Sequence, residues 1–157
     1  PRRRASIDTA ALAAAFADGG LHGTPIERVV EAVGVAKPTL YARGGDKAEL
    51  FALAVEAEVE RLIERFEGGV PQLAAALDAY VATPAARLVL VSARLGGHDR
   101  ALRRITIALT AAVGDERIAS ALLGAAWSAL HGGPPVTAVA RLLPPPDAAP
   151  PSGIWTA

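Results

Sequence analysis

The sequence predicts an all-α protein. Apolar residues recur at helical spacing in one stretch after another, which is the primary signal for amphipathic helices. Hydrophobic residues make up 52% of the chain but aromatic residues only 4%, and the many alanines suit closely packed helices. One apolar run, residues 88–91, could be mistaken for a buried strand, but no partner strand is visible elsewhere. At 157 residues the chain is long enough for one or two small domains with a buried core.

Residues 24–51 contain the clearest local signals. Thr24 is a suitable N-cap, Pro25 suits the first helical position, and Glu27 completes a T-x-x-E capping box. One apolar face follows at helical spacing: Ile26, Val29, Val30 and Val33. Gly34 stands where a helix ends in a left-handed residue. We therefore expect a helix that begins at Thr24 and stops in a tight turn at Gly34.

A short second helix is expected over residues 36–42. Pro38 is tolerated there because it lies in the first turn, where its missing N–H has no role within the helix. Leu40 is best placed to face inward. Four neighbours are left to point outward: Lys37, Thr39, Tyr41 and Arg43. The helix after it is expected to be capped by Asp46, with Glu49 as the capping partner.

These three elements together resemble the TetR family of bacterial transcriptional regulators. The resemblance rests on the V-G-V turn, on A-K-P-T-L-Y in the second helix and on D-K-A-E-L-F opening the third, and it extends over about residues 6–66. It implies an N-terminal three-helix helix-turn-helix DNA-binding domain followed by a C-terminal helical domain for ligand binding and dimerisation. Two positions depart from the family pattern. Ala36 replaces the usual Ser or Thr N-cap, at a cost of ~1 kcal/mol, and Gly44 replaces an aromatic core residue, so the loop after it should be looser.

The resemblance also implies which residues meet DNA. Lys37 and Thr39 would reach into the major groove, while Tyr41, Thr24 and Lys47 would hold phosphates. The full candidate set is Thr24, Ala36, Lys37, Pro38, Thr39, Tyr41, Arg43 and Lys47. Lys and Arg balance Asp and Glu at 16 each over the chain, but residues 1–47 carry seven basic and five acidic side chains. A local basic surface on a neutral protein is compatible with DNA binding. The alternative is an ordinary helical hairpin with a basic, solvated face.

The rest of the chain suggests a four-part division. Residues 1–48 form the expected DNA-binding domain, with a first helix over about residues 6–18 that Ser6 can cap and a plain connection over residues 21–23. Residues 49–66 form a connecting helix long enough to link two domains, residues 67–143 a helical regulatory and dimerisation domain, and residues 144–157 a Pro-rich tail. Helices are expected over residues 71–83, from Pro84, over 98–113, over 115–131 with Asp115 as cap, and over 136–143.

The family resemblance implies a ligand cavity within this second domain. Candidate lining residues are Leu77, Tyr80, Val91, Arg94, Leu95, Ile105, Leu109 and Trp127, with Thr106 and Thr110 as further polar groups. Apolar walls with a few polar groups are typical of small-molecule pockets. The same side chains could equally be plain core.

The resemblance further implies a homodimer joined through the last substantial helices. The best candidate is residues 115–131, with an apolar face made of Ile118, Ala119, Leu122, Leu123, Ala126, Trp127 and Leu130. Part of this face must close the monomer core, and all of it could do so.

The sequence offers no sign of catalysis. It has no Cys and three His, and it contains no nucleophile, phosphate-loop or metal-ligand motif, so we expect a protein that is not an enzyme and holds no metal or cofactor. No apolar run reaches the ~18 residues of a membrane span, and we expect a soluble cytoplasmic protein. The expected partners are a double-stranded DNA operator, a second copy of the chain and a small, mostly apolar effector. The alternative is a helical dimer without operator binding that acts by ligand sequestration or protein contacts.

Overall fold

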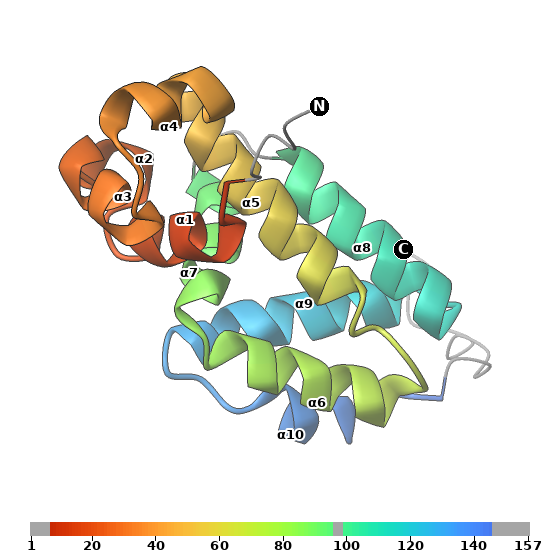
Figure 1. Ribbon diagram of the computed structural model, residues 1–157. Coiled ribbons are helices and arrows are strands. Elements are labelled where there is room, and N and C mark those ends of the chain that lie inside the picture. Colours follow the sequence, from red (N-terminus) through yellow and green to blue (C-terminus); the bar gives the residue numbers. More distant parts are fainter. Residues whose placement is uncertain (1–6, 96–98, 146–157) are drawn as a thin grey trace, which may run out of the picture.

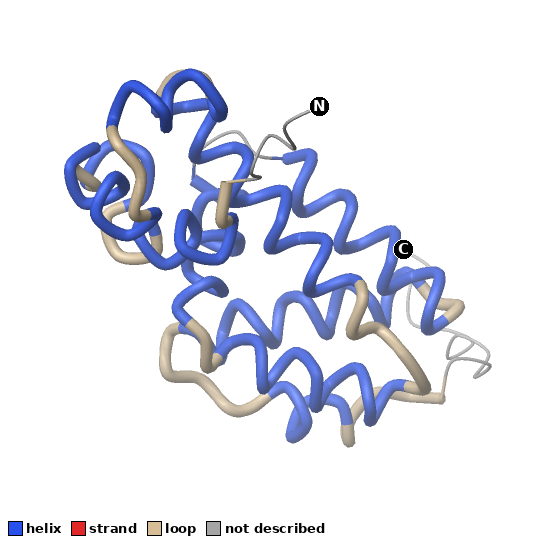
Figure 2. The backbone as a smooth tube through the Cα atoms, viewed as in Figure 1, coloured by secondary structure: helices blue, strands red, loops and turns tan. Residues whose placement is uncertain are grey.

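The computed structural model describes residues 7–95 and 99–145, with the side chains of 91–95 and 99 left out. Within these residues the chain forms ten helices and no strand, which confirms the predicted fold class (Figures 1 and 2). In chain order the helices are α1 (Thr9–Phe16), α2 (Gly20–Gly23), α3 (Ile26–Val33), α4 (Lys37–Gly44), α5 (Lys47–Ile63), α6 (Val70–Val81), α7 (Pro84–Leu95), α8 (Asp99–Val113), α9 (Glu116–Leu130) and α10 (Val136–Ala140).

The first helix differs from the expected one at both ends. Asp8 caps α1 by accepting hydrogen bonds from the backbone N–H groups of Ala10 and Ala11, at 2.9 and 3.1 Å. The helix therefore begins at Thr9, and the expected cap, Ser6, lies outside the described residues. The chain expected to be a plain connection contains the one-turn helix α2, which opens at a glycine with positive φ.

The predicted capping box at Thr24 is wrong. Thr24 ends α2 instead of starting α3, and its hydroxyl is buried without a hydrogen-bond partner. α3 is preceded by Pro25, which cannot cap with its side chain. The prediction for the other end of α3 is confirmed, because Gly34 has a φ of 69° and its N–H donates to the carbonyl of Val30 at 3.0 Å.

α5 connects the two halves of the molecule. It begins with the predicted capping box, in which Asp46 accepts from the N–H of Glu49 at 2.9 Å and Glu49 accepts from the N–H of Asp46 at 2.7 Å. Its first turns lie beside α1 and α4, and its later turns run alongside α8 (Figure 1). The helix is therefore placed to carry a change in position from one half to the other.

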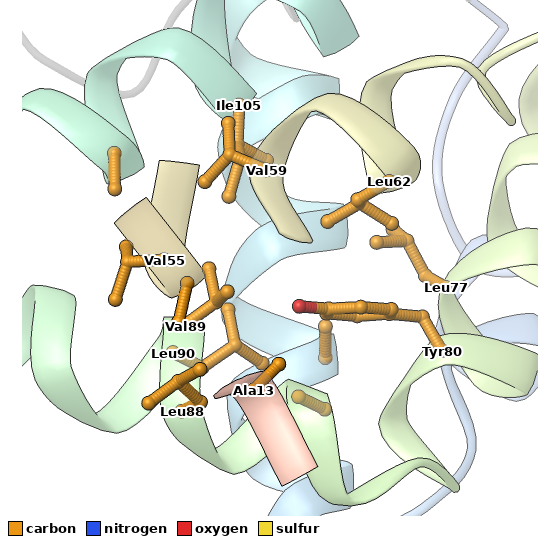
Figure 3. Packing of buried hydrophobic residues seen from close by; sticks show 14 of the residues in the cluster. Ala13, Val55, Val59, Leu62, Leu77, Tyr80, Leu88, Val89, Leu90 and Ile105 are labelled. Atoms are coloured by element: carbon orange, nitrogen blue, oxygen red, sulfur yellow. The ribbon is translucent and has the colours of Figure 1, made fainter. Parts of the chain in front are cut away.

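A single apolar cluster extends through both halves. Leu12 and Phe16 of α1 meet Phe51 of α5, with the two aromatic rings edge to face at 5.2 Å. Figure 3 shows Tyr80 of α6 extending into the same cluster near Leu77 and Leu62. The Tyr80 hydroxyl donates to the carbonyl of Ala85 at 3.3 Å; burial, then the nearby charge of Glu58, raises its pKa well above the usual value.

The last short helix depends on a partner far away in the chain. Asp78 of α6 accepts from the N–H groups of Val136 and Thr137, at 2.6 and 3.0 Å, and from the Thr137 hydroxyl at 2.8 Å. Burial alone would raise the pKa of Asp78, but these hydrogen bonds outweigh it and hold that pKa below its ordinary value. Asp78 therefore caps α10 and fixes it against α6.

No single helix among the described residues is long and apolar enough to cross a membrane. α6 and residues 84–90 of α7 reach the required length and apolar character only as a pair bent by 102°. Several of the apolar side chains of that pair, among them Leu73, Leu77 and Leu88, are buried in the protein core.

Candidate nucleic-acid interface

α4 lies at one end of the molecule with most of its surface exposed (Figure 1). Leu40 is fully buried and holds the helix on the core, as expected. Ala36 occupies the N-cap position without a side-chain hydrogen bond, which confirms that the usual cap is missing, and Pro38 follows in the first turn. The solvent side of the helix carries Lys37, Pro38, Tyr41 and Arg43 among the candidate contacts, with Tyr41 37% exposed. A short helix held by one buried anchor and otherwise free suits entry into a DNA groove.

Lys37 is not free in this structure. Its Nζ lies 3.1 Å from Oε1 of Glu27, so the first residue of α4 is paired with the first turn of α3. The Glu27 backbone N–H, and then Lys37, hold the pKa of Glu27 below its ordinary value, so the carboxylate is charged at neutral pH. Both side chains are well exposed, at 48% and 74%. Lys37 can reach a base edge only after its ion pair with Glu27 breaks, or if the Glu27 side chain turns together with the lysine.

Ile7 and Leu50 occupy the place where the family has an aromatic residue. A Cβ at Gly44 would clash with the Leu50 side chain and would lie 2.7 Å from Cδ1 of Ile7. The core under the end of α4 is thus closed by two aliphatic side chains from α5 and from the chain before α1. Gly45 then turns the chain into α5 with φ 75° and ψ −153°, a conformation that is essentially restricted to glycine.

The start of α5 lies next to the end of α4. Lys47 is its first residue and is half-buried, so its stem is held by packing. The Asp46–Glu49 capping box uses the N–H of Glu49 but leaves the earlier N–H groups of the helix without intrahelical partners. Those groups and Lys47 make this end attractive to a phosphate, while the two carboxylates of the box oppose it.

Most of the predicted DNA contacts thus lie together at one end of the molecule, whereas Thr24 is enclosed and separated from them. Thr39 and Lys47 are half-buried, and Thr24 is only 2% exposed. Because the Thr24 hydroxyl is enclosed between α2 and α3, it cannot touch a phosphate without a local rearrangement.

Two groups of charged side chains tie α5 to its neighbours, and both went unpredicted. Arg61 pairs with Glu58, which is only 7% exposed, and donates to the Thr9 hydroxyl of α1 at 2.6 Å. On the other side, Arg104 of α8 binds the carboxylates of both Glu56 and Glu60. The sequence did contain a signal for the second group, because Glu56 and Glu60 are spaced i, i+4 on one helix and Arg100 and Arg104 have the same spacing on another. Arg100 also approaches Glu56, at 3.9 Å.

Four of the expected ligand residues lie in the core and line none of the hollows described here. Leu77, Tyr80, Ile105 and Leu109 are buried in the core, the alternative that the sequence left open. Burial against other side chains leaves them no free surface for a ligand. The side chains of Val91, Arg94 and Leu95 lie outside the described part. Thr106 donates to the carbonyl of Leu102 in its own helix.

The expected dimer face is likewise divided between core and surface. Ile118, Ala119, Leu122 and Ala126 point into the monomer core and are therefore not available to a partner. Leu123, Trp127 and Leu130 are partly exposed. Leu123 and Trp127 belong to a shallow groove of about 270 Å³, whose walls also include Leu90, Leu102, Ser120 and Gly124. The candidate face is thus narrower than expected. Within the part that the structure describes, no three His, Asp or Glu side chains come together as a metal site.

Comparison with known proteins agrees with this geometry. Residues 9–54 match the family described as bacterial regulatory proteins, tetR family. The crystal structure of a TetR-like transcriptional regulator from Rhodococcus sp. RHA1 superposes with a TM-score of 0.57 at 26% sequence identity, over 85% of this chain and 87% of that chain. None of the curated proteins matches this chain. The helix-turn-helix of α3 and α4, the family match over it and the structural likeness of the whole chain lead to one conclusion: the protein belongs to the TetR family and is a transcriptional regulator with an N-terminal DNA-binding domain.

Proposed function

We propose that the chain acts as a homodimeric repressor that leaves its operator when a small effector binds. The observation that carries the DNA-binding part is the exposure of α4, which presents Lys37, Tyr41 and Arg43 on a helix anchored by Leu40. In this proposal residues 1–48 bind DNA, residues 49–66 connect, and residues 67–143 regulate and dimerise. The place of action is the cytoplasm, where bacterial DNA lies.

The DNA-binding part is tested with DNA from upstream of the protein's own gene. Tyr41→Ala should weaken binding to every sequence and change its salt dependence little, because Tyr carries no charge. Lys47→Ala should lower the salt slope by about one unit. Arg103→Gln is the matched control, because Arg103 is an exposed arginine of α8, away from α4. If both test variants bind the native operator as the control does, the assigned surface is wrong.

The dimer is expected to use the exposed remainder of α9. One small helix-turn-helix makes few base contacts, so two copies on half-sites about one turn (~34 Å) or a multiple apart are the usual solution. Leu123 and Trp127 supply an apolar surface beside Gly124, which allows close approach of a second helix. Leu123→Glu should give folded monomers in analytical ultracentrifugation, whereas Ala75→Glu, an exposed change on α6, should not. A Leu123→Glu variant that stays dimeric moves the interface elsewhere.

A second function is favoured by the details of the DNA-binding surface. The absent cap at Ala36, the enclosed hydroxyl of Thr24 and the pairing of Lys37 all reduce what this surface offers to DNA. They fit a helical dimer that binds no operator and acts by ligand sequestration or protein contacts. The two functions are separated by a gel shift at about 50 mM salt, where phosphate contacts are strongest. Absence of any preference for the upstream DNA over unrelated DNA selects the second.

A further inference from the structure

One hollow lies between the two halves of the chain. It has a volume of about 370 Å³ and is lined by residues 16–20 after α1, by the first half of α7 and by the end of α9. Leu130, which is partly exposed, gives it an apolar wall, and Arg87 and His131 bring nitrogen donors. The neighbouring Phe16 and Leu88 are almost fully buried in the core. The volume is at the small end of the range for small-molecule pockets, which is ~300–1,000 Å³.

The charges at this cleft favour an anion. Arg87 is exposed and makes no ion pair with any side chain that the structure describes. Asp18 also lies at the cleft, but its carboxylate is paired with Arg28 of α3 at 3.2 Å. The negative charge is therefore partly neutralised from the α3 side, and the guanidinium of Arg87 has no such partner. An anionic group entering the cleft would supply one.

His131 is held so that one ring nitrogen remains available. Its Nδ1 lies 2.8 Å from the carbonyl oxygen of Trp127, and a carbonyl only accepts, so Nδ1 carries the proton. The imidazole also lies against the Trp127 indole, with ring centroids 4.4 Å apart. The orientation of the ring is thus fixed, and no described residue makes a hydrogen bond to Nε2, so this nitrogen can meet a ligand. Together with Arg87 it gives the cleft two polar groups beside an apolar wall.

The position of the cleft connects it to DNA binding. Residues 16–20 lead directly into α2 and α3, whereas Arg87 and His131 belong to helices of the second half. A molecule that contacts both sides favours one relative position of the two halves. A ligand changes an equilibrium only through such a difference in affinity between two conformations, and the effect on DNA binding must be reciprocal.

We propose that this cleft is the effector site and that its ligand is a small organic monocarboxylate with an apolar body. The carboxylate binds the guanidinium of Arg87 with help from His131, and the apolar body lies against the partly exposed side chain of Leu130. The regulatory part of this proposal rests on the proposed repressor function; the binding site itself does not.

Calorimetric titration of the full chain with benzoate and with hexanoate, in the absence of DNA, tests the site. The neutral controls are benzamide and hexanamide. At least one acid should bind, and its amide should bind at least about tenfold more weakly, because a hydrogen-bonded ion pair is lost. Arg87→Gln should weaken binding of the acid by a similar factor. Arg103→Gln, which changes an exposed arginine of α8, should leave the affinity for the acid within twofold of the native value. Equal binding of acid and amide, no effect of Arg87→Gln, or binding of neither acid would overturn the proposal.

The regulatory part is tested separately by gel shift on the upstream DNA with and without the acid that binds. Release should occur with the native protein and with Arg103→Gln but not with Arg87→Gln. Binding that requires Arg87 but leaves operator affinity unchanged overturns the effector role. If the native protein binds no operator at all, the repressor function fails, and the titration without DNA still decides whether the site exists.

Discussion

Glu27→Gln should strengthen DNA binding, because Glu27 holds the lysine that begins the recognition helix. Nζ of Lys37 and Oε1 of Glu27 are 3.1 Å apart. Both side chains are well exposed, at 48% and 74%, so solvent and salt leave only the small net attraction that is typical of surface ion pairs.

This energy opposes binding if Lys37 must leave Glu27 to reach DNA. Removing the carboxylate charge should then lower the dissociation constant by a factor of about 1.4 to 5, the range that is typical of surface ion pairs. The gain should be larger at about 50 mM than at about 200 mM salt, because salt screens the pair. Fluorescence anisotropy with the upstream DNA measures both values.

Glu31→Gln is the matched control for this measurement. Glu31 is an exposed glutamate one turn further along α3, and it makes no ion pair with any described side chain. It reports how much affinity is gained from removing one negative charge near the phosphates. If the two variants gain equally, the pair with Lys37 has no special role. If Glu27→Gln weakens binding, the carboxylate orients Lys37 for DNA and the reasoning above is refuted.

Three further changes test the packing and charge arrangements. Gly45→Ala should destabilise the fold by about 1–3 kcal/mol, because its backbone conformation is restricted to glycine and a Cβ would meet Glu49. Gly23→Ala, at the end of α2 and with open space around it, should not destabilise in the same thermal scan. Asp78→Asn should cost about 1 kcal/mol in urea unfolding at pH 7. The lowered pKa of Asp78 means that its contribution is complete above the ordinary carboxyl value of 3.8 and is lost as the pH falls through the lowered pKa, so the variant should lose this part of the pH dependence. Arg104→Gln should cost about 1 kcal/mol or less at low salt and nearly nothing at about 1 M salt, because its partners are partly exposed carboxylates.

The features predicted correctly are those that depend on neighbours in sequence. The Asp46–Glu49 box, the left-handed Gly34 and the Asp115 cap of α9 each need only three or four consecutive residues. The buried position of Leu40 follows from the helical period in the same way. Such local rules also gave the fold class, because most of the described helices place apolar side chains in the core.

Apart from the local errors at Thr24 and at the start of α1, the features that were missed depend on residues far apart in sequence. Asp78 caps α10 across 58 residues, and Ile7 closes the space left at Gly44. For a half-buried apolar face, helical spacing cannot tell whether the neighbour is the same chain or a second copy. For this reason the expected dimer face contained both kinds of residue. Ala119 and Leu122 are buried in the core, whereas Leu123 and Trp127 are partly exposed.

The same distant contacts bear on how a signal could pass through the molecule. α5 is fixed to α1 through Arg61 and Thr9, and to α8 through Arg104. A shift of α8 would therefore pull on α5 through charged groups, while α1 would resist it through the partly buried hydrogen bond between Arg61 and Thr9. The proposed ligand cleft lies at the end of α1, beyond this attachment. A ligand there would act on the DNA-binding half directly, through the chain that leads from α1 to α3, without first having to move α5 along its whole length.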